Sequence, residues 1–227
     1  MKKLHFVVCT KHNAIKFQTD SDIYQFFNDN KLIEGVDYTV IYNNTKGLSQ
    51  RYNEFLSEYY QDRIVVFVHD DVQLTHSIST ITRELNTGHS KGFNIIGVAG
   101  ATKIGLKYPT LWHIMNTGER SGSVGHPCGD GEYIVTPFGP APRSCAVVDG
   151  LFLSVDVDVV LKAGHKFDEQ FKFHHYDIDF CIQASMKGLT VGTYPIWVTH
   201  RSPGLRSLED INWSLSNKLF CIKYEIQ

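Results

Sequence analysis

The chain has 227 residues, of which 42% are hydrophobic and 20% charged, a composition typical of soluble globular domains. Its formal net charge of −2 provides no electrostatic footprint for nucleic acid or for an anionic membrane surface. This length suits one domain with a sizeable core, so we expect a single domain over residues 1–227.

The cysteines and the N-terminal residues indicate a reducing compartment. The cysteines are odd in number and none forms a CxxC pair, which argues against a disulfide framework and a zinc ribbon. They are Cys9, Cys128, Cys145, Cys181 and Cys221. The apolar run 4–9 is too short for a signal peptide, and no stretch reaches the ~18 apolar residues of a membrane-spanning helix. We expect a cytoplasmic protein without a transmembrane segment.

The first half alternates between strand and helix patterns. Short apolar runs predict strands at 4–9, 38–42, 64–68 and 94–101. Apolar residues recur at helical spacing over 20–28 and 48–59. Strands that alternate with helices favour a parallel sheet with crossover helices.

The second half begins with a break in this pattern. Glycine and proline are frequent over 102–143, which predicts a long irregular segment, and its part 121–131 could close over a ligand as a lid. Strands are expected at 146–155 and 190–198, and helices at 157–163 and after Asp177.

A final helix is expected after Ser207-x-x-Asp210, which resembles a capping box. Its apolar stripe must be buried against something, and a homodimer through this helix is one arrangement that would bury it. The stripe consists of Leu208, Ile211, Leu215, Leu219 and Ile222.

Three polar residues, His69-Asp70-Asp71, directly follow the apolar strand 64–68. In a parallel sheet, such residues lie at the edge where ligands bind. His69 and Asp71 are two positions apart and share a side if the chain stays extended. An imidazole and a carboxylate on one side suit a divalent cation that also holds phosphate oxygens. The alternative is a polar strand end in which an aspartate caps the next turn.

Two further aspartates, Asp177 and Asp179, lie where a helix is expected to begin. Two residues turn a helix by about 200°, so both cannot face one ligand. We expect one to act as a general base and the other to cap the helix. The helix dipole should keep the base ionised. Alternatively, both are caps.

Two other positions could carry chemistry. His200 follows the expected strand 190–198, where a structural role is also an option. Asp149-Gly150 interrupts the apolar run 146–155, and a carboxylate there should be paired or bound to a ligand, because burying it alone is costly.

Taken in order, these segments resemble the GT-A-fold glycosyltransferases, in particular the family-2-like group. His69-Asp70-Asp71 resembles the D-x-D motif of that family, and Ser49-x-x-Tyr52-Asn53 resembles a helix near its nucleotide site. The most specific match runs from Phe167-Asp168-Glu169-x-Phe171 through Tyr176-Asp177-Ile178-Asp179-Phe180-Cys181 to Gly188 and His200. The resemblance implies an α/β fold of GT-A type, with a mostly parallel central sheet flanked by helices. It also implies a nucleotide-binding half at about 1–101 and an acceptor half at about 102–227.

The resemblance also implies roles for individual residues. Asp177 matches the base of inverting members, and a cation, Mn²⁺ or Mg²⁺, would be held by His69, Asp71 and His200. The nucleotide-sugar site would include Thr10, Asn43, Asn44, Ser49, Asn53, Asp70 and Asp71. The acceptor or sugar site would include Trp112, His113, Asp149, Gly150 and Tyr176. His69 stands where the family usually has aspartate, and Tyr176 where it usually has glutamate.

The expected function is therefore metal-dependent transfer of a sugar from a nucleotide-sugar donor to a hydroxyl of a glycan or another acceptor, in a role such as polysaccharide biosynthesis. Two alternatives remain. A sugar nucleotidyltransferase would show a Gly-rich signature after the first strand, and Thr10-Lys11-His12-Asn13 differs from it. A catalytically silent carbohydrate- or nucleotide-sugar-binding protein would keep the fold without turnover.

Overall fold

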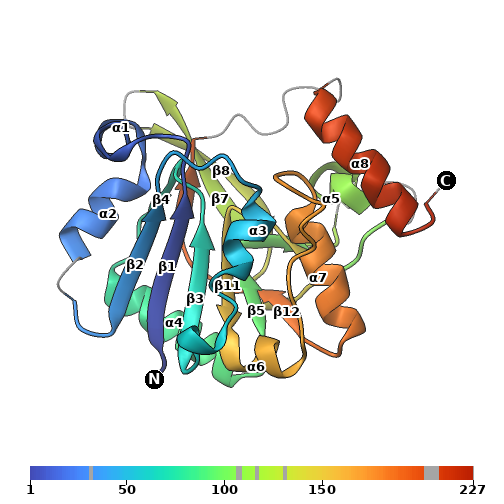
Figure 1. The fold of residues 1–227 in the computed structure, drawn as a ribbon, viewed down its shortest axis with the longest axis horizontal. Helices are drawn as coiled ribbons and strands as arrows, with labels where there is room; N and C mark the ends of the chain where they lie inside the picture. Colours follow the sequence, from blue (N-terminus) through green and yellow to red (C-terminus); the bar gives the residue numbers. More distant parts are fainter. Residues whose placement is uncertain (31–32, 106–108, 116–117, 130–131, 202–209, 227) are drawn as a thin grey trace.

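The computed structural model describes residues 1–227 except 31–32, 106–108, 116–117, 130–131, 202–209 and 227. The strands are β1 (Lys3–Cys9), β2 (Val36–Ile41), β3 (Arg63–Val68), β4 (Val72–Leu74), β5 (Ile95–Gly97), β6 (Ala99–Ala101), β7 (Arg120–Gly129), β8 (Glu132–Gly139), β9 (Arg143–Ser144), β10 (Val147–Val148), β11 (Phe152–Asp156), β12 (Val191–Thr193) and β13 (Val198–His200). The helices are α1 (Ala14–Asp20), α2 (Ile23–Asn30), α3 (Leu48–Asn53), α4 (Ile78–Ser90), α5 (Trp112–Met115), α6 (Val157–Lys162), α7 (Tyr176–Met186) and α8 (Ile211–Lys223). Helices flank a central sheet, so the α/β class is confirmed (Figure 1).

The central sheet has the order β2-β1-β3-β11-β5-β12-β9. Strands β2, β1 and β3 are parallel, as are β5 and β12. However, β11 runs antiparallel to both β3 and β5, and β9 runs antiparallel to β12. Because β5 and β3 are both antiparallel to β11, the strands β2, β1, β3, β5 and β12 all run in one direction, and only β11 and β9 are reversed. The sheet is therefore mostly parallel, as expected, but mixed rather than purely parallel. At the end that carries β2, β1 and β3, neighbouring strands are parallel without interruption, and helices connect successive strands.

A second sheet has the order β10-β6-β7-β13-β4, with β8 paired to β7. The expectation of an irregular segment over 102–143 is therefore wrong for most of its second half, because β7 and β8 form an antiparallel hairpin there. Its glycines allow close packing: a Cβ on Gly122 would lie 1.9 Å from the carbonyl oxygen of Val98. Most of the lid expected at 121–131 is strand β7, bonded to β6 and β8, and residues 130–131 lie outside the described part.

Three segments expected as single strands are each divided between the two sheets. The run 94–101 forms β5 and β6, the run 146–155 contributes to β10 and β11, and the run 190–198 leads through β12 to β13. Close contact accompanies the first crossing, since a Cβ on Gly97 would lie 2.6 Å from Cβ of Val148. Periodicity cannot predict such a division, because both strands of each pair are buried.

The helices lie where the sequence predicts them, but their lengths differ from the prediction. Helix α3 ends at Asn53, so the expected helix 48–59 is too long, and the helix expected at 20–28 is α2. Helix α8 begins after Asp210, whose carboxylate accepts hydrogen bonds from the backbone of Asn212 and Trp213. The N-cap is therefore Asp210, while Ser207 and Leu208 lie outside the described residues.

The apolar stripe of α8 faces solvent. Ile211, Leu215, Leu219 and Ile222 are 41–67% exposed, and Phe220 on another side of the helix is fully buried. The expected burial of the stripe is therefore wrong for the single chain, and a homodimer through α8 stays a prediction. No helix of the described residues is long and apolar enough to cross a membrane.

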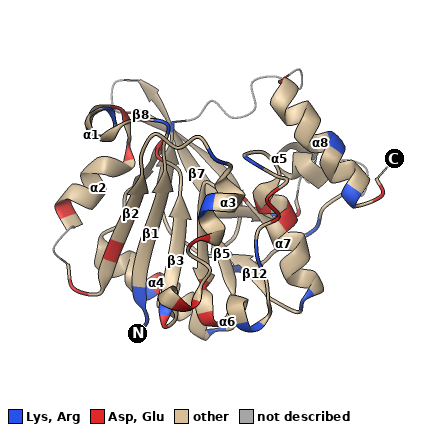
Figure 2. Ribbon diagram, viewed as in Figure 1, with Lys and Arg blue, Asp and Glu red and all other residues tan. Residues whose placement is uncertain are grey.

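Helix α8 lies beside α7 at one end of the domain (Figure 1). One Asp179 oxygen is 2.6 Å from Nζ of Lys223 and accepts a hydrogen bond of 2.7 Å from the Tyr224 hydroxyl. Asp179 is 1% exposed, and Lys223 also pairs with Asp168. Asp179 thus connects α7 to α8 rather than capping α7, whose N-cap is His175. Elsewhere, charges of both signs are spread over the ribbon (Figure 2).

Asp179→Asn should lower the free energy of unfolding by about 1–3 kcal/mol, because it removes a charged partner of two buried hydrogen bonds. Chemical denaturation would measure this loss. Asp168→Asn is the matched control, since it removes the more exposed carboxylate on the same lysine. If Asp168→Asn costs as much as Asp179→Asn, the buried contact does not hold the helices together.

Candidate functional site

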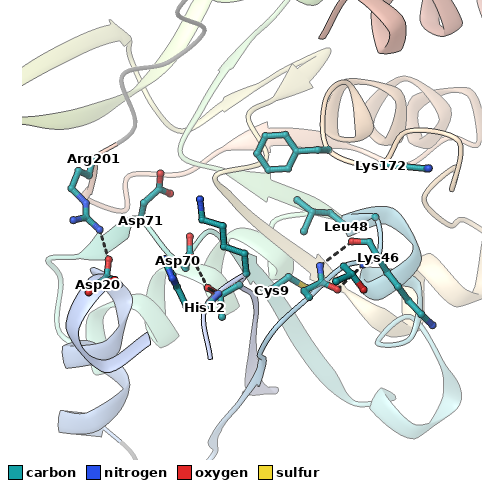
Figure 3. Close-up of a pocket in the computed structure, with 15 residues that line it drawn as sticks. Cys9, His12, Asp20, Lys46, Leu48, Asp70, Asp71, Lys172 and Arg201 are labelled. Atoms are coloured by element: carbon teal, nitrogen blue, oxygen red, sulfur yellow. Dashed lines mark hydrogen bonds between the residues drawn. The ribbon is translucent and has the colours of Figure 1, made fainter. Parts of the chain in front are cut away.

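A cavity of about 590 Å³ lies beyond the carboxyl ends of β1, β2 and β3. Thr10, Asn44, Asp70 and Asp71 line it from the loops that follow these strands. We call it the first cavity. Its walls also carry the cations Lys11, Lys46, Lys172 and Arg201. Arg201 donates to the backbone carbonyl of Asp20 (Figure 3), and an ion pair of 2.9 Å joins it to Asp22.

Backbone and side-chain bonds hold the floor of the first cavity. The Thr10 hydroxyl donates to Asp70 at 2.5 Å, and the Thr10 carbonyl accepts from the backbone of Asn44. Asn43 has a φ of 49° and its backbone donates to the carbonyl of His12, so it forms the turn after β2 without lining the cavity. Four of the expected nucleotide-site residues therefore lie together, and Asn43 supports them.

The other two expected nucleotide-site residues have structural partners instead. Ser49 is fully buried and donates to the carbonyl of Phe171. Asn53 exchanges hydrogen bonds with the backbone of Phe167 and also donates to Glu169. The structure does not bring either into the first cavity; they attach α3 to the segment 167–171.

His69, Asp71 and His200 form a cluster whose ligand atoms all lie within 4.8 Å of one another. Because β13 pairs with β4, His200 lies opposite Val72, and its Nε2 is 3.2 Å from Asp71 Oδ1. Two imidazoles and one carboxylate form a donor set that suits a divalent transition metal with open positions for other ligands.

The electrostatics of the cluster pair a neutral imidazole with an ionised carboxylate. Burial lowers the pKa of His69, although the charge of Asp71 opposes this shift. Burial alone would raise the pKa of Asp71, but the hydrogen bond and charge of His200 lower it. Conversely, Asp71 outweighs burial at His200 and raises its pKa. A cation could take the place of the proton that His200 and Asp71 share.

Tyr176 links this cluster to the start of α7. Its hydroxyl lies 3.0 Å from His69 Nε2 and donates to the carbonyl of Gly150 at 3.0 Å. Tyr176 is 3% exposed and lines neither the first cavity nor the cavity between Trp112, His113 and Asp149 that is described below. Its contact orients the His69 ring, as partners of metal ligands commonly do. His175 bonds to Ser216 of α8, so it too is structural.

Asp177, in the first turn of α7, accepts hydrogen bonds from the backbone of Gly150 and Ile178. Exclusion of water raises its pKa to about 7, and the negative charge of Asp149 adds to the shift. The expectation that the helix dipole keeps this carboxyl ionised is therefore wrong near and below neutral pH. A group with this pKa can accept and return a proton near neutrality.

His200 lines a second cavity, of about 330 Å³. It contains three of the expected acceptor residues, Trp112, His113 and Asp149, together with Arg120 and Phe138. Trp112 is only 3% exposed and packs on Phe138, so most of its ring is core. Gly150 is a backbone element, since a Cβ there would lie 2.2 Å from the Tyr176 hydroxyl.

Sequence reasoning missed the cations of both cavities. Lys11 and Lys46 are isolated lysines after strands, and Lys172 follows the segment 167–171. Arg120 begins the hairpin strand that was expected to be irregular. The one available signal was position, because Lys11 lies two residues after the end of β1, as Asp70 lies two residues after the end of β3.

Comparisons with known proteins identify a family and two proteins of similar structure. The family described as "Glycosyltransferase like family" matches residues 5–224. The structure is similar to the mannosyltransferase PcManGT from Pyrobaculum calidifontis in complex with GDP-Man and Mn²⁺, with a TM-score of 0.50, 9% sequence identity, and coverage of 90% of this chain and 58% of that chain. It also matches the protein A197 from STIV, with a TM-score of 0.41, 12% identity, and coverage of 88% and 82%. No protein with a curated description matches the chain.

The mannosyltransferase likeness concerns the fold alone, and the chain spans 58% of that protein's length. It agrees with the GT-A-type fold expected from the sequence. The family match covers nearly the whole chain, including both cavities and the His69–Asp71–His200 cluster. This chain therefore belongs to the glycosyltransferase-like family.

Proposed function

We propose that the chain is a metal-dependent glycosyltransferase that moves a sugar from a nucleotide-sugar donor to a hydroxyl of a glycan or another acceptor. The observation that carries the proposal is the place of the His69–Asp71–His200 cluster. Asp71 lines the first cavity and His200 lines the second, and the two side chains are 3.2 Å apart. A donor in the first cavity and an acceptor in the second would meet at this cluster. Membership of the family supports glycosyl transfer as the reaction.

The first cavity suits the nucleoside diphosphate. Lys11, Lys46, Lys172 and Arg201 provide positive charge for phosphate oxygens, and Thr10, Asn44 and Asp70 provide polar contacts. The mannosyltransferase of similar fold was solved with GDP-Man and Mn²⁺. The two imidazoles at this site favour Mn²⁺ over Mg²⁺, which prefers oxygen ligands. A divalent cation there would neutralise the charge that develops on the leaving diphosphate.

Asp177 is the proposed base. In its ionised form, Asp177 would take the proton of the acceptor hydroxyl through one carboxylate oxygen. The hydroxyl oxygen would then attack the anomeric carbon as the nucleoside diphosphate leaves from the opposite side. This displacement inverts the configuration of the sugar. Asp149 is the other candidate, because it lines the second cavity whereas Asp177 lies behind the turn at Gly150. We assign the abstraction of the acceptor proton to Asp177, because its raised pKa suits a base that works near neutral pH.

A first prediction concerns metal-dependent donor binding. GDP- or UDP-sugars should raise the melting temperature in the presence of Mn²⁺ and not in excess chelator, because a ligand that binds only the folded state stabilises it. A ligand at 100 times its Kd adds about 2.7 kcal/mol. Asp71→Ala should abolish this shift. Asp37→Asn is the control, since Asp37 pairs with Arg63 on the protein surface. Stabilisation by donor that persists without metal, or in Asp71→Ala, would refute the metal site.

A second prediction concerns the base. Asp177→Asn should lower kcat by on the order of 10²–10⁴ while donor binding is retained, because the amide cannot take the proton. Single-turnover transfer with radiolabelled donor would measure it. Should Asp149→Asn silence turnover while Asp177→Asn retains it, the proton acceptor is Asp149. A silent binding protein would show donor stabilisation without transfer or donor hydrolysis in the wild type.

A third prediction follows from the pKa of Asp177. The base works only when ionised, so kcat should rise with pH and level off above about 7. Asp149→Asn removes the negative charge that contributes to the raised pKa, so this limb should move to lower pH. Among the described residues, Tyr52, Tyr176 and Cys181 also interact with Asp177, and burial raises their pKa values, so they stay neutral across this range. A pH profile that Asp149→Asn leaves unmoved would contradict the coupling.

A further inference from the structure

Arg120 is a cation in the wall of the second cavity without a carboxylate partner among the described residues. Its Nη1 donates to the carbonyl of His113 at 2.8 Å, and its guanidinium lies 5.8 Å from the centre of the Phe138 ring. Nε is buried and has no hydrogen-bond partner. Within the described part of the chain, Nη2 makes no hydrogen bond either. Nε is therefore a buried guanidinium nitrogen without a partner, and no carboxylate of the described residues lies beside the charge.

An arginine in this position is costly unless something binds it. The guanidinium cannot lose its proton, so the charge persists at any pH the protein encounters. Partial burial of a charged donor without a partner costs free energy. Asp149 lines the same cavity, yet no ion pair within 4.0 Å joins the two side chains. The cavity therefore contains both a carboxylate and an uncompensated guanidinium.

The diphosphate of a donor does not account for Arg120. The first cavity has four cations of its own, and Arg120 does not line it. The second cavity otherwise combines apolar walls, such as Phe138 and Leu151, with the imidazoles of His113, His126 and His200. Such walls suit a sugar ring, and the guanidinium adds one site for a negative group at its edge.

We propose that the second cavity selects a substrate that carries an anionic group, a carboxylate or a phosphate monoester, and that Arg120 binds this group. Planar guanidinium groups bind both anions through paired N–H donors, so the shared chemistry is a compact oxyanion on a sugar. This inference rests on the proposed function only in treating the second cavity as a sugar site. Arg120 is then a specificity-determining residue rather than part of the proton transfer.

The test measures binding, not turnover. The wild-type protein with Mn²⁺ and inorganic pyrophosphate, added to fill the first cavity, is titrated with methyl glucoside, methyl glucuronide and glucose 6-phosphate, and the heat of binding is recorded by isothermal titration calorimetry. One of the two anionic probes should bind about 10-fold tighter or more than the neutral glucoside, as expected for a charge-assisted hydrogen bond. The tighter of the two identifies the anion as carboxylate or phosphate. Equal affinities for all three probes would overturn the proposal.

Three variants locate the effect. Arg120→Gln should bind anionic and neutral probes equally. Arg120→Lys keeps the positive charge but lacks the paired N–H donors of the guanidinium, so it should retain part of the preference for the anionic probe. Phe138→Leu, in the same cavity, should weaken all probes while keeping their ratio. Lys172→Gln, in the first cavity, should keep the ratio too. A preference that survives Arg120→Gln, or is lost in Lys172→Gln, would show that the anion binds elsewhere. Melting curves of each variant confirm folding, and Mn²⁺-dependent donor hydrolysis on the same samples tests the proposed function separately.

Discussion

The close packing of the turn 149–151 against the start of α7 is the contact on which the rest of the site depends. Gly150 has no side chain, and this lets its backbone donate to Asp177 while its carbonyl accepts from Tyr176. A Cβ at this position would lie 2.2 Å from the Tyr176 hydroxyl, so any larger residue would push α7 away. The next carbonyl, that of Leu151, accepts from the backbone of His69. One turn thus positions the proposed base, the tyrosine that orients His69, and His69 itself.

The same turn brings two carboxylates together. Asp149 and Asp177 come from different elements, yet the charge of Asp149 adds to the effect of burial on the pKa of Asp177. Keeping both ionised at a partly buried site is unfavourable, which is why burial and the Asp149 charge together raise the pKa of Asp177 to about 7. Electrostatic repulsion between neighbouring carboxylates is common at catalytic sites, where it shifts pKa values to suit proton transfer. Here it would make Asp177 a base that both takes and releases a proton readily.

The two sheets provide different parts of the proposed site. The parallel strands β1, β2 and β3 end at the first cavity, in the manner of α/β folds that bind nucleotides. The second sheet provides the hairpin β7–β8, from which Arg120 and Phe138 reach the second cavity. His200 lies where the sheets meet, because β13 pairs with β4 immediately after the Asp71 loop. The cluster can therefore touch ligands on both sides.

Local signals in the sequence were enough for the α/β class, the strands β1, β2 and β3, the helices α6 and α7, and the polar group at 69–71. These features depend on side-chain pattern over a few residues, so composition and periodicity reveal them. Family resemblance added the grouping of Asp71 with His200, which the structure brings to within 3.2 Å.

Only the tertiary structure decided that β11 runs antiparallel between β3 and β5, that 120–139 is a hairpin, and that Ser49 and Asn53 bind backbone. It also decided the protonation of Asp177 and the isolation of Arg120. These properties come from contacts between residues distant in the chain, and a carboxyl or guanidinium has the same sequence signature whether its neighbours neutralise it or leave it unpaired.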